Sequence, residues 1–206
     1  MAVTYTVLTA AKTTSGSLAN WVNRSDLATE NIVLEAEAWI YERLRVREMI
    51  ADEAVTFSSA ASSKALSTLA ATFLDPIQFV PYTWGSPLEY VSETMFRPSR
   101  NTSGTLDSAA EPSVWTIIGA TAHLDVLLSA NFSGRMMYYA RPAALSSTET
   151  NFLTVRYPTL LRYALMGKAY DHMKDTQRSL EYLQKAEVAI AEAARTNEMY
   201  RRGQYA

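Results

Sequence analysis

Two acid–histidine pairs are the first candidates for chemistry in this chain, whose only histidines are His123 and His172. His123 and Asp125 stand two residues apart on an expected strand, so their side chains share one face. Together with a positioned serine they would supply a Ser-His-Asp catalytic triad, but no serine stands in a G-x-S-x-G motif. We interpret the pair as a hairpin histidine beside a polar neighbour.

His172 lies on an expected helix, with Asp175 three residues further on, a spacing at which both side chains can bind one metal ion. No third ligand accompanies them, so the spacing favours a surface pair. The chain has no cysteine, which excludes thiolate nucleophiles, disulfides and Cys-based zinc sites. The glycines never fall within three residues of one another, so neither a dinucleotide-binding motif nor a P-loop is present.

Carboxylates and aromatic side chains are the remaining candidates. Glu35, Glu37 and Glu42 are placed like the solvated face of a helix, and nothing selects a glycosidase pair among the carboxylates. Four aromatic residues are candidates for stacking on nucleic-acid bases: Trp84, Trp115, Tyr138 and Tyr139. No basic residues are interleaved with them, so we expect core and interface positions. The sequence therefore predicts no catalysis, no cofactor and no metal.

The composition indicates a folded chain without a strong electric field. Of its 206 residues 48% are hydrophobic, and 19 Lys and Arg oppose 21 Asp and Glu, a formal net charge of -2. This balance argues against a free-standing nucleic-acid-binding domain. The first residues carry no basic region and no apolar run approaches the length of a membrane span, so we expect neither a signal peptide nor a membrane segment.

The elements that would position these candidate residues include helices, since both ends of the chain show helical periodicity. After an N-terminal arm (1–17), helices are predicted within 18–50, where Ser25 or Asp26 is expected to cap the helix that starts near residue 29. Further helices are predicted within 157–195, with Pro158 in a first turn and Asp175 as a cap. The apolar face expected for the last helix is formed by Leu180, Leu183, Ala186 and Ile190. Residues 196–206 are predicted to be a flexible tail.

The middle of the chain, 51–156, is predicted to be an antiparallel β-subdomain. Short β-prone segments alternate there with turn residues, and Gly119 stands between two of them, as expected for a hairpin. Pro76 and Pro81 favour edge positions or strand ends. The polar segment 99–113 is predicted to be a mobile surface loop. The fold class is therefore α+β, with N- and C-terminal helices packed as a helical bundle and the β-subdomain inserted between them.

An ordered series of segments within 18–195 resembles the head-to-tail adaptor, or head completion, proteins of short-tailed and related tailed bacteriophages. The similar segments are 21–27, 37–49, 73–75, 88–92, 115–119 and 137–146, followed by Leu145-Ser146, Asn151-Phe-Leu153 and Tyr157-Pro-Thr-Leu-Leu161 through to Lys174-Asp175. One departure concerns the segment 70–72, where Ala-Ala-Thr replaces a usual Leu-Pro pair. The Ser- and Thr-rich approach to it also leaves the path of 58–72 open.

The resemblance implies a structural virion protein that forms a ring, commonly of twelve copies, beneath the portal protein. Such a ring would extend the DNA channel, dock tail tube or nozzle proteins and let genomic DNA pass without sequence-specific binding. It would belong to the neck or tail of the virion and assemble in the cytoplasm of the host bacterium.

The C-terminal segment often reaches the portal in this family, and here it holds residue types common at interfaces: Arg195, Tyr200, Arg201 and Arg202. These are the candidate portal interface, unless the terminus has no role. Two other interpretations remain, a non-viral helical protein-binding module and a virion-associated hydrolase.

Overall fold

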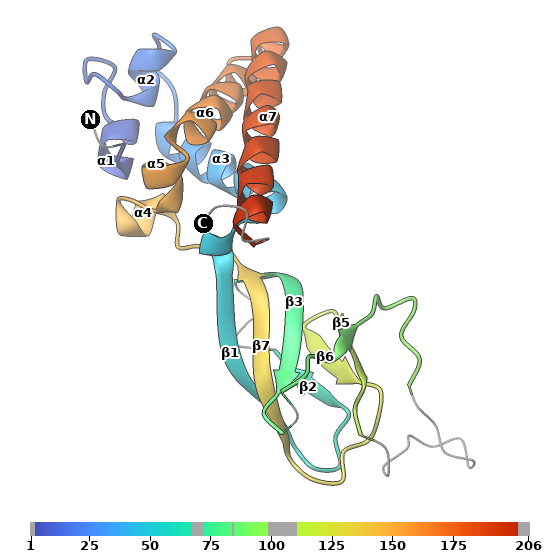
Figure 1. Cartoon of the computed structure of the whole chain (residues 1–206). Helices are drawn as coiled ribbons and strands as arrows, with labels where there is room; N and C mark the ends of the chain where they lie inside the picture. Colours follow the sequence, from blue (N-terminus) through green and yellow to red (C-terminus); the bar gives the residue numbers. More distant parts are fainter. Residues whose placement is uncertain (1–2, 67–71, 84, 99–110, 202–206) are drawn as a thin grey trace. The chain divides into compact units, whose positions relative to one another are not determined.

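The computed structural model describes residues 3–66, 72–83, 85–98 and 111–201 and shows a mixed α+β chain (Figure 1), which confirms the predicted class. Its helices are α1 (Tyr5–Thr9), α2 (Leu18–Trp21), α3 (Thr29–Arg43), the 3-10 helix η1 (Arg47–Met49), α4 (Leu145–Thr148), α5 (Phe152–Arg156), α6 (Pro158–His172) and α7 (Thr176–Arg201). Its strands are β1 (Ile50–Phe57), β2 (Ser63–Ala65), β3 (Phe73–Pro81), β4 (Glu89–Tyr90), β5 (Val114–Ile118), β6 (Thr121–Leu124) and β7 (Phe132–Ala140).

The chain divides into two compact units. Met1–Met49 and Pro142–Ala206 form one, which holds the helices given above and is called the helical unit below. Ile50–Arg141 form the other, the β unit, which holds the strands given above. Each unit is stabilised differently, so each is described by itself.

Three stretches of the helical unit differ from the sequence-based expectation. The arm 1–17 contains α1, whose N-cap Thr4 accepts a hydrogen bond from the Val7 amide. Residues 142–156, expected among the strands, contain α4 and α5; Asn151 and Thr154 form a capping box that starts α5. Helix α7 runs on to Arg201, so the part of the predicted tail up to that residue is helical.

The predicted cap of α3 is wrong. Asp26 forms an ion pair with Arg24, and the N-cap residue of α3 is Ala28, which makes no side-chain cap. Two other local signals in the helical unit are confirmed. Pro158 stands in the first turn of α6, and the Asp175 carboxylate accepts from the Arg178 amide at the start of α7.

The β unit contains two sheets, ordered β1-β7-β3 and β2-β6-β5-β4. All pairs are antiparallel except β4 with β5, which is parallel and departs from the expected pattern. The hairpin β5–β6 turns at Gly119. Its φ of 59° is a left-handed conformation that glycine adopts without steric cost. Pro76 lies in the edge strand β3, where a missing amide donor is tolerated. Most of the expected loop 99–113, namely 99–110, lies outside the described residues.

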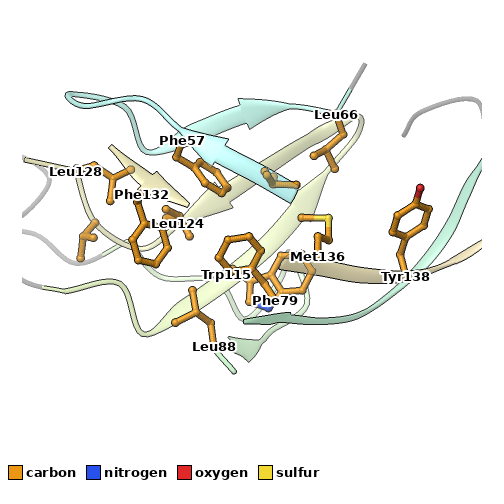
Figure 2. Packing of buried hydrophobic residues seen from close by; sticks show 13 residues of the cluster. Phe57, Leu66, Phe79, Leu88, Trp115, Leu124, Leu128, Phe132, Met136 and Tyr138 are labelled. Carbon is orange, nitrogen blue, oxygen red and sulfur yellow. The ribbon is translucent and has the colours of Figure 1, made fainter. Parts of the chain in front are cut away.

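The two sheets of the β unit enclose one aromatic core (Figure 2). Phe79 of β3 lies at its centre, with its ring centroid 5.9 Å from that of Phe57, 5.9 Å from that of Phe132 and 6.1 Å from that of Trp115. Gly134 of β7 faces Phe79 so closely that a Cβ there would meet the ring at 2.6 Å. Aromatic packing across the two sheets therefore fixes their spacing.

Candidate functional site

The first acid–histidine pair does not form a catalytic arrangement. Asp125 is buried just beyond β6, where one carboxylate oxygen accepts from the Ser113 amide (3.1 Å) and the other from the Ser113 hydroxyl (2.8 Å). His123 instead lies near Phe96, with 6.4 Å between the ring centroids. The carboxylate binds Ser113 rather than orienting an imidazole, so it makes a buried structural contact. His123 does lie in the β5–β6 hairpin, as expected, but Asp125 is not its hydrogen-bond partner.

In the second pair, His172 and Asp175, each residue also binds a different partner. The His172 Nε2 atom lies 3.0 Å from Glu35 Oε2, which joins the end of α6 to α3, while Asp175 caps α7. No group of three or more His, Cys, Asp or Glu side chains that could hold a metal ion occurs within residues 3–66, 72–83, 85–98 and 111–201. Within the described part of the chain, no helix is long and apolar enough to cross a membrane.

The prediction that Glu37 belongs to a solvated helix face is wrong. Its side chain is buried, with 2% exposed, and its carboxylate accepts from the Leu145 amide, the Asn151 side-chain amide (2.9 Å) and the Tyr41 hydroxyl (3.2 Å). Burial raises the pKa of Glu37, against the opposing effect of these hydrogen bonds. The acid therefore joins α3 to the first residue of α4 and to the N-cap residue of α5.

The aromatic candidates are also structural. Trp115 and Tyr138 are buried in the core of the β unit, and the Tyr138 hydroxyl donates to Glu53 (3.1 Å). Tyr139 is half-buried, and Trp84 lies outside the described residues. Among the described candidates, Trp115 and Tyr138 are therefore core residues and not a surface for stacking on bases.

The best binding surface belongs to the hairpin of α6 and α7. The inner face of α7 is built from small or polar residues, with Ser179, Ala186 and Ala193 buried against α6. Gly167 of α6 allows a close approach, since a Cβ there would meet the Leu183 side chain at 2.8 Å. Two larger aliphatic side chains of α7, Leu180 and Val188, are exposed.

The predicted apolar face of α7 is only partly right. Ala186 is buried and Leu183 meets α6 at Gly167, but Leu180, expected on the same face, is 55% exposed. Ser179 and Asn197 are buried on the inner side, so small and amide residues at helical spacing mark this face together with the apolar ones. Val188, which was not expected on the inner face, is 69% exposed.

Two grooves run along this hairpin. One, of about 370 Å³, is lined by the first turn of α6 and the C-terminal half of α7, including Pro158, Leu160, Ala189 and Ala193. The other, of about 380 Å³, is mostly apolar and is lined by Tyr163, Glu181, Gln184, Lys185 and Val188. Together they make an elongated surface with exposed apolar groups, which suits a helix or loop of another chain.

The predicted portal-interface residues lie at the C-terminal end of the same hairpin. Arg195 is exposed on α7, whereas Asn197 on the buried side accepts from the Arg47 amide (3.0 Å). Tyr200 and Arg201 belong to the last turn of α7, and Arg202 lies outside the described residues. Arg195, Tyr200 and Arg201 are thus carried by one helix whose register Asn197 fixes.

Comparison with known proteins identifies one family. The model of the SU10 adaptor protein family matches residues 9–205, nearly the whole chain. A search of the curated proteins gives no match.

Proposed function

Because the chain belongs to the SU10 adaptor protein family, a family of phage head-to-tail adaptors, we propose that it works as a ring beneath the portal protein. The match over residues 9–205 carries this proposal. The ring extends the DNA channel, and tail tube or nozzle proteins dock on it. The protein resides in the virion neck and assembles in the cytoplasm of the bacterial host.

The proposed mechanism is geometric and involves no catalysis. A closed ring needs a heterologous contact, in which one surface of each copy meets a different surface of the next copy. The surface with two grooves on α6 and α7 supplies one such surface. The helices of the unit act as a bundle that forms the rigid wall, and the inserted β unit is available to a tail component. Twelve copies would match the number common in adaptor rings.

The weak net charge supports passage of DNA rather than binding. A formal net of -2 over 206 residues gives no basic excess to hold phosphates. DNA that must leave the head in one event moves fastest along a wall that does not bind it. The absence of a basic excess is therefore consistent with a channel component.

The C-terminal end of α7 is the proposed portal contact. Arg195, Tyr200, Arg201 and Arg202 combine guanidinium groups with an aromatic ring, the residue types most enriched at the energetic centres of interfaces. A truncation that tests them must keep Asn197, because Asn197 holds Arg47 and its loss would disturb the fold.

Negative-stain electron microscopy of the chain mixed with its portal protein tests the ring. The expected result is a ring of the portal's symmetry, attached to the portal. A chain that stays monomeric in the presence of the portal would overturn the proposal and return the helical protein-binding module to first place.

Portal binding by variants tests the contact. A variant that ends at residue 201 and carries alanine at positions 195, 200 and 201 should bind the portal at least tenfold more weakly, about 1.4 kcal/mol, because the loss of interface arginines and tyrosines commonly costs more than that. Arg178→Ala in a chain that also ends at residue 201 is the matched control, because it removes an exposed guanidinium near the start of α7, away from both grooves. Equal binding by the multiple variant and the control would show that the portal contact lies elsewhere.

A further inference from the structure

The N-terminal strap, defined as residues 4–9, is joined to the end of α4 through Glu149. The Tyr5 amide donates to the Glu149 carbonyl (2.9 Å), and the Thr6 amide (3.0 Å) and the Thr6 hydroxyl (2.7 Å) donate to the two carboxylate oxygens. The bonds from Thr6 lower the pKa of Glu149, as expected for a carboxylate that accepts them as an anion. One exposed residue therefore binds the strap with both its main chain and its side chain.

Glu149 has a strained backbone. Its φ of 61° and ψ of -37° are uncommon for a residue with a side chain. The Thr150 amide donates to the Thr148 carbonyl (2.7 Å), which closes a three-residue turn around Glu149, close to the γ-turn of positive φ that is rare and strained. Such strain persists only where surrounding contacts impose it. The docked strap supplies such contacts, so its release would let Glu149 relax.

The strap depends on its site for its own structure. Helix α1 has five residues, too few to be stable as an isolated helix. Leu8 is its buried residue, and the Thr29 hydroxyl of α3 donates to the Thr9 carbonyl (3.3 Å). Glu149 and the adjoining part of α3 are called the strap site below. The strap brings one core side chain to this site and can leave it as a unit.

The connector between the strap and α2, residues 10–16, can change its path at little cost. None of its residues is buried. Its turn is closed by local bonds, from the Thr14 amide (2.8 Å) and the Ser17 hydroxyl (3.1 Å) to the Ala11 carbonyl, and Gly16 stands at a φ of 91°. Seven residues in extended form span roughly 23–25 Å. The connector is therefore long enough to carry the strap to a copy that lies in contact.

We propose that in the ring the strap of each copy docks on the strap site of the next copy; this rests on the proposed adaptor function. The occupant follows from the structure, because the site already holds residues 4–9 and a second copy offers the same residues. Exchange keeps the bonds to Glu149 and the burial of Leu8, and it opens only the turn of the connector. Swapping an identical element between copies is a low-cost route to assembly for this reason.

Exchange also gives the kind of contact that a closed ring needs. The strap of one copy meets a different surface, the strap site, on the next copy, and a series of such heterologous contacts closes into a ring. The contact adds to the one proposed for α6 and α7. Each copy would then be tied to both neighbours, once through its strap and once through its strap site.

Site-specific crosslinking tests the exchange in a chain that has no cysteine of its own. Tyr5→Cys and Thr150→Cys on the same chain place thiols beside the bond between the Tyr5 amide and the Glu149 carbonyl and leave the Glu149 carboxylate intact. In the isolated chain a short bis-maleimide should link them within one chain, which runs as a monomer on a denaturing gel. In rings assembled on the portal, products of two or more chains should be at least tenfold more abundant.

Thr56→Cys with Ser133→Cys is the matched control. These residues face each other on β1 and β7, with their hydroxyl oxygens 2.8 Å apart, and have no part in the strap. The control pair should give monomers in the isolated chain and in rings. If the pair at 5 and 150 also gives only monomers in rings, each strap stays on its own copy and the exchange is refuted.

Mixed rings give a second readout. One chain carries only Tyr5→Cys and the other only Thr150→Cys, so that no link can form within a chain. Exchange predicts linked pairs of unlike chains in rings built from both. Rings without linked pairs would contradict it.

Ring formation and strap exchange fail separately. A chain that forms no ring with the portal would contradict the proposed function and the exchange with it. A ring that forms with each strap on its own copy would contradict only the exchange.

Discussion

The two units of this chain are stabilised by different interactions. The β unit is built around Phe79, whose ring lies against those of Phe57, Phe132 and Trp115. The helical unit has a buried polar centre, where Glu37 joins α3 to residues more than a hundred positions away in the sequence. Apolar side chains can pack in several orientations, whereas a buried carboxylate keeps three hydrogen bonds only when its donors stand in one arrangement. We infer that the β unit depends on packed volume and the helical unit on the exact placement of its hydrogen bonds.

Phe79→Ala should have the largest effect on the β unit. Removing a central ring costs the transfer free energy and leaves a cavity, so the free energy of unfolding should fall by about 3–5 kcal/mol. Urea denaturation followed by near-UV circular dichroism measures this. Met95→Ala, at a side chain that is 70% exposed, is the control and should leave the midpoint almost unchanged. Similar midpoints for both variants would refute the role of Phe79.

Glu37→Ala should be the most damaging single change in the polar centre of the helical unit. The Leu145 amide and the Asn151 side-chain amide would lose their acceptor inside the protein, and a buried donor without a partner costs about 1–3 kcal/mol. Urea denaturation followed by far-UV circular dichroism should show this loss. Glu42→Ala, an exposed acid of the same helix, is the control. An equally small effect of both changes would contradict a polar centre.

Local features were predictable from the sequence, whereas distant partners were not. Gly119 indicates its hairpin because a turn is decided by neighbouring residues, and Asp175 indicates the cap of α7 for the same reason. Glu37 was placed on a solvated face because its own helix offers only Tyr41 one turn on. The residues that bury it, Leu145 and Asn151, come from another part of the chain, and no local pattern reports them.

The candidate site follows the same rule. The α6–α7 hairpin and the basic residues near its end can be recognised in the sequence, but the grooves cannot. They depend on how closely α6 approaches α7, which Gly167 and Leu183 decide together. The sequence also does not show that β1 is an outer strand of its sheet, because the pattern of a strand does not tell which strands lie beside it.

Asp175→Ala should have a smaller effect, at the start of α7. The carboxylate accepts from the Arg178 amide (3.1 Å), and loss of such an N-cap costs about 1 kcal/mol. Thermal unfolding followed by far-UV circular dichroism should show a lower midpoint. Asp171→Ala is the matched control, because an acid near the C-terminal end of α6 is disfavoured by the helix dipole and its removal should not destabilise. A midpoint lowered equally by both changes would show that the cap is not the cause.

The smallest expected effect is the part of the pH dependence of stability that comes from Glu37. Burial raises its pKa above the ordinary value of 4.5, although hydrogen bonds from Leu145, Tyr41 and Asn151 oppose the shift. A raised pKa in the folded state adds stability that is complete below 4.5 and is lost as the pH rises through the folded pKa. Glu37→Gln cannot ionise and should lack this loss.

Urea denaturation of the native chain and of Glu37→Gln between about pH 4 and pH 8 measures that difference. The stability of the native chain relative to the variant should fall as the pH rises from 4.5 and become constant above the folded pKa. Other titrating groups cancel in the comparison, since both chains carry them. A difference that rises with pH would mean that the three donors stabilise the carboxylate more than burial opposes it, and the polar centre would then be an anion site rather than a buried acid.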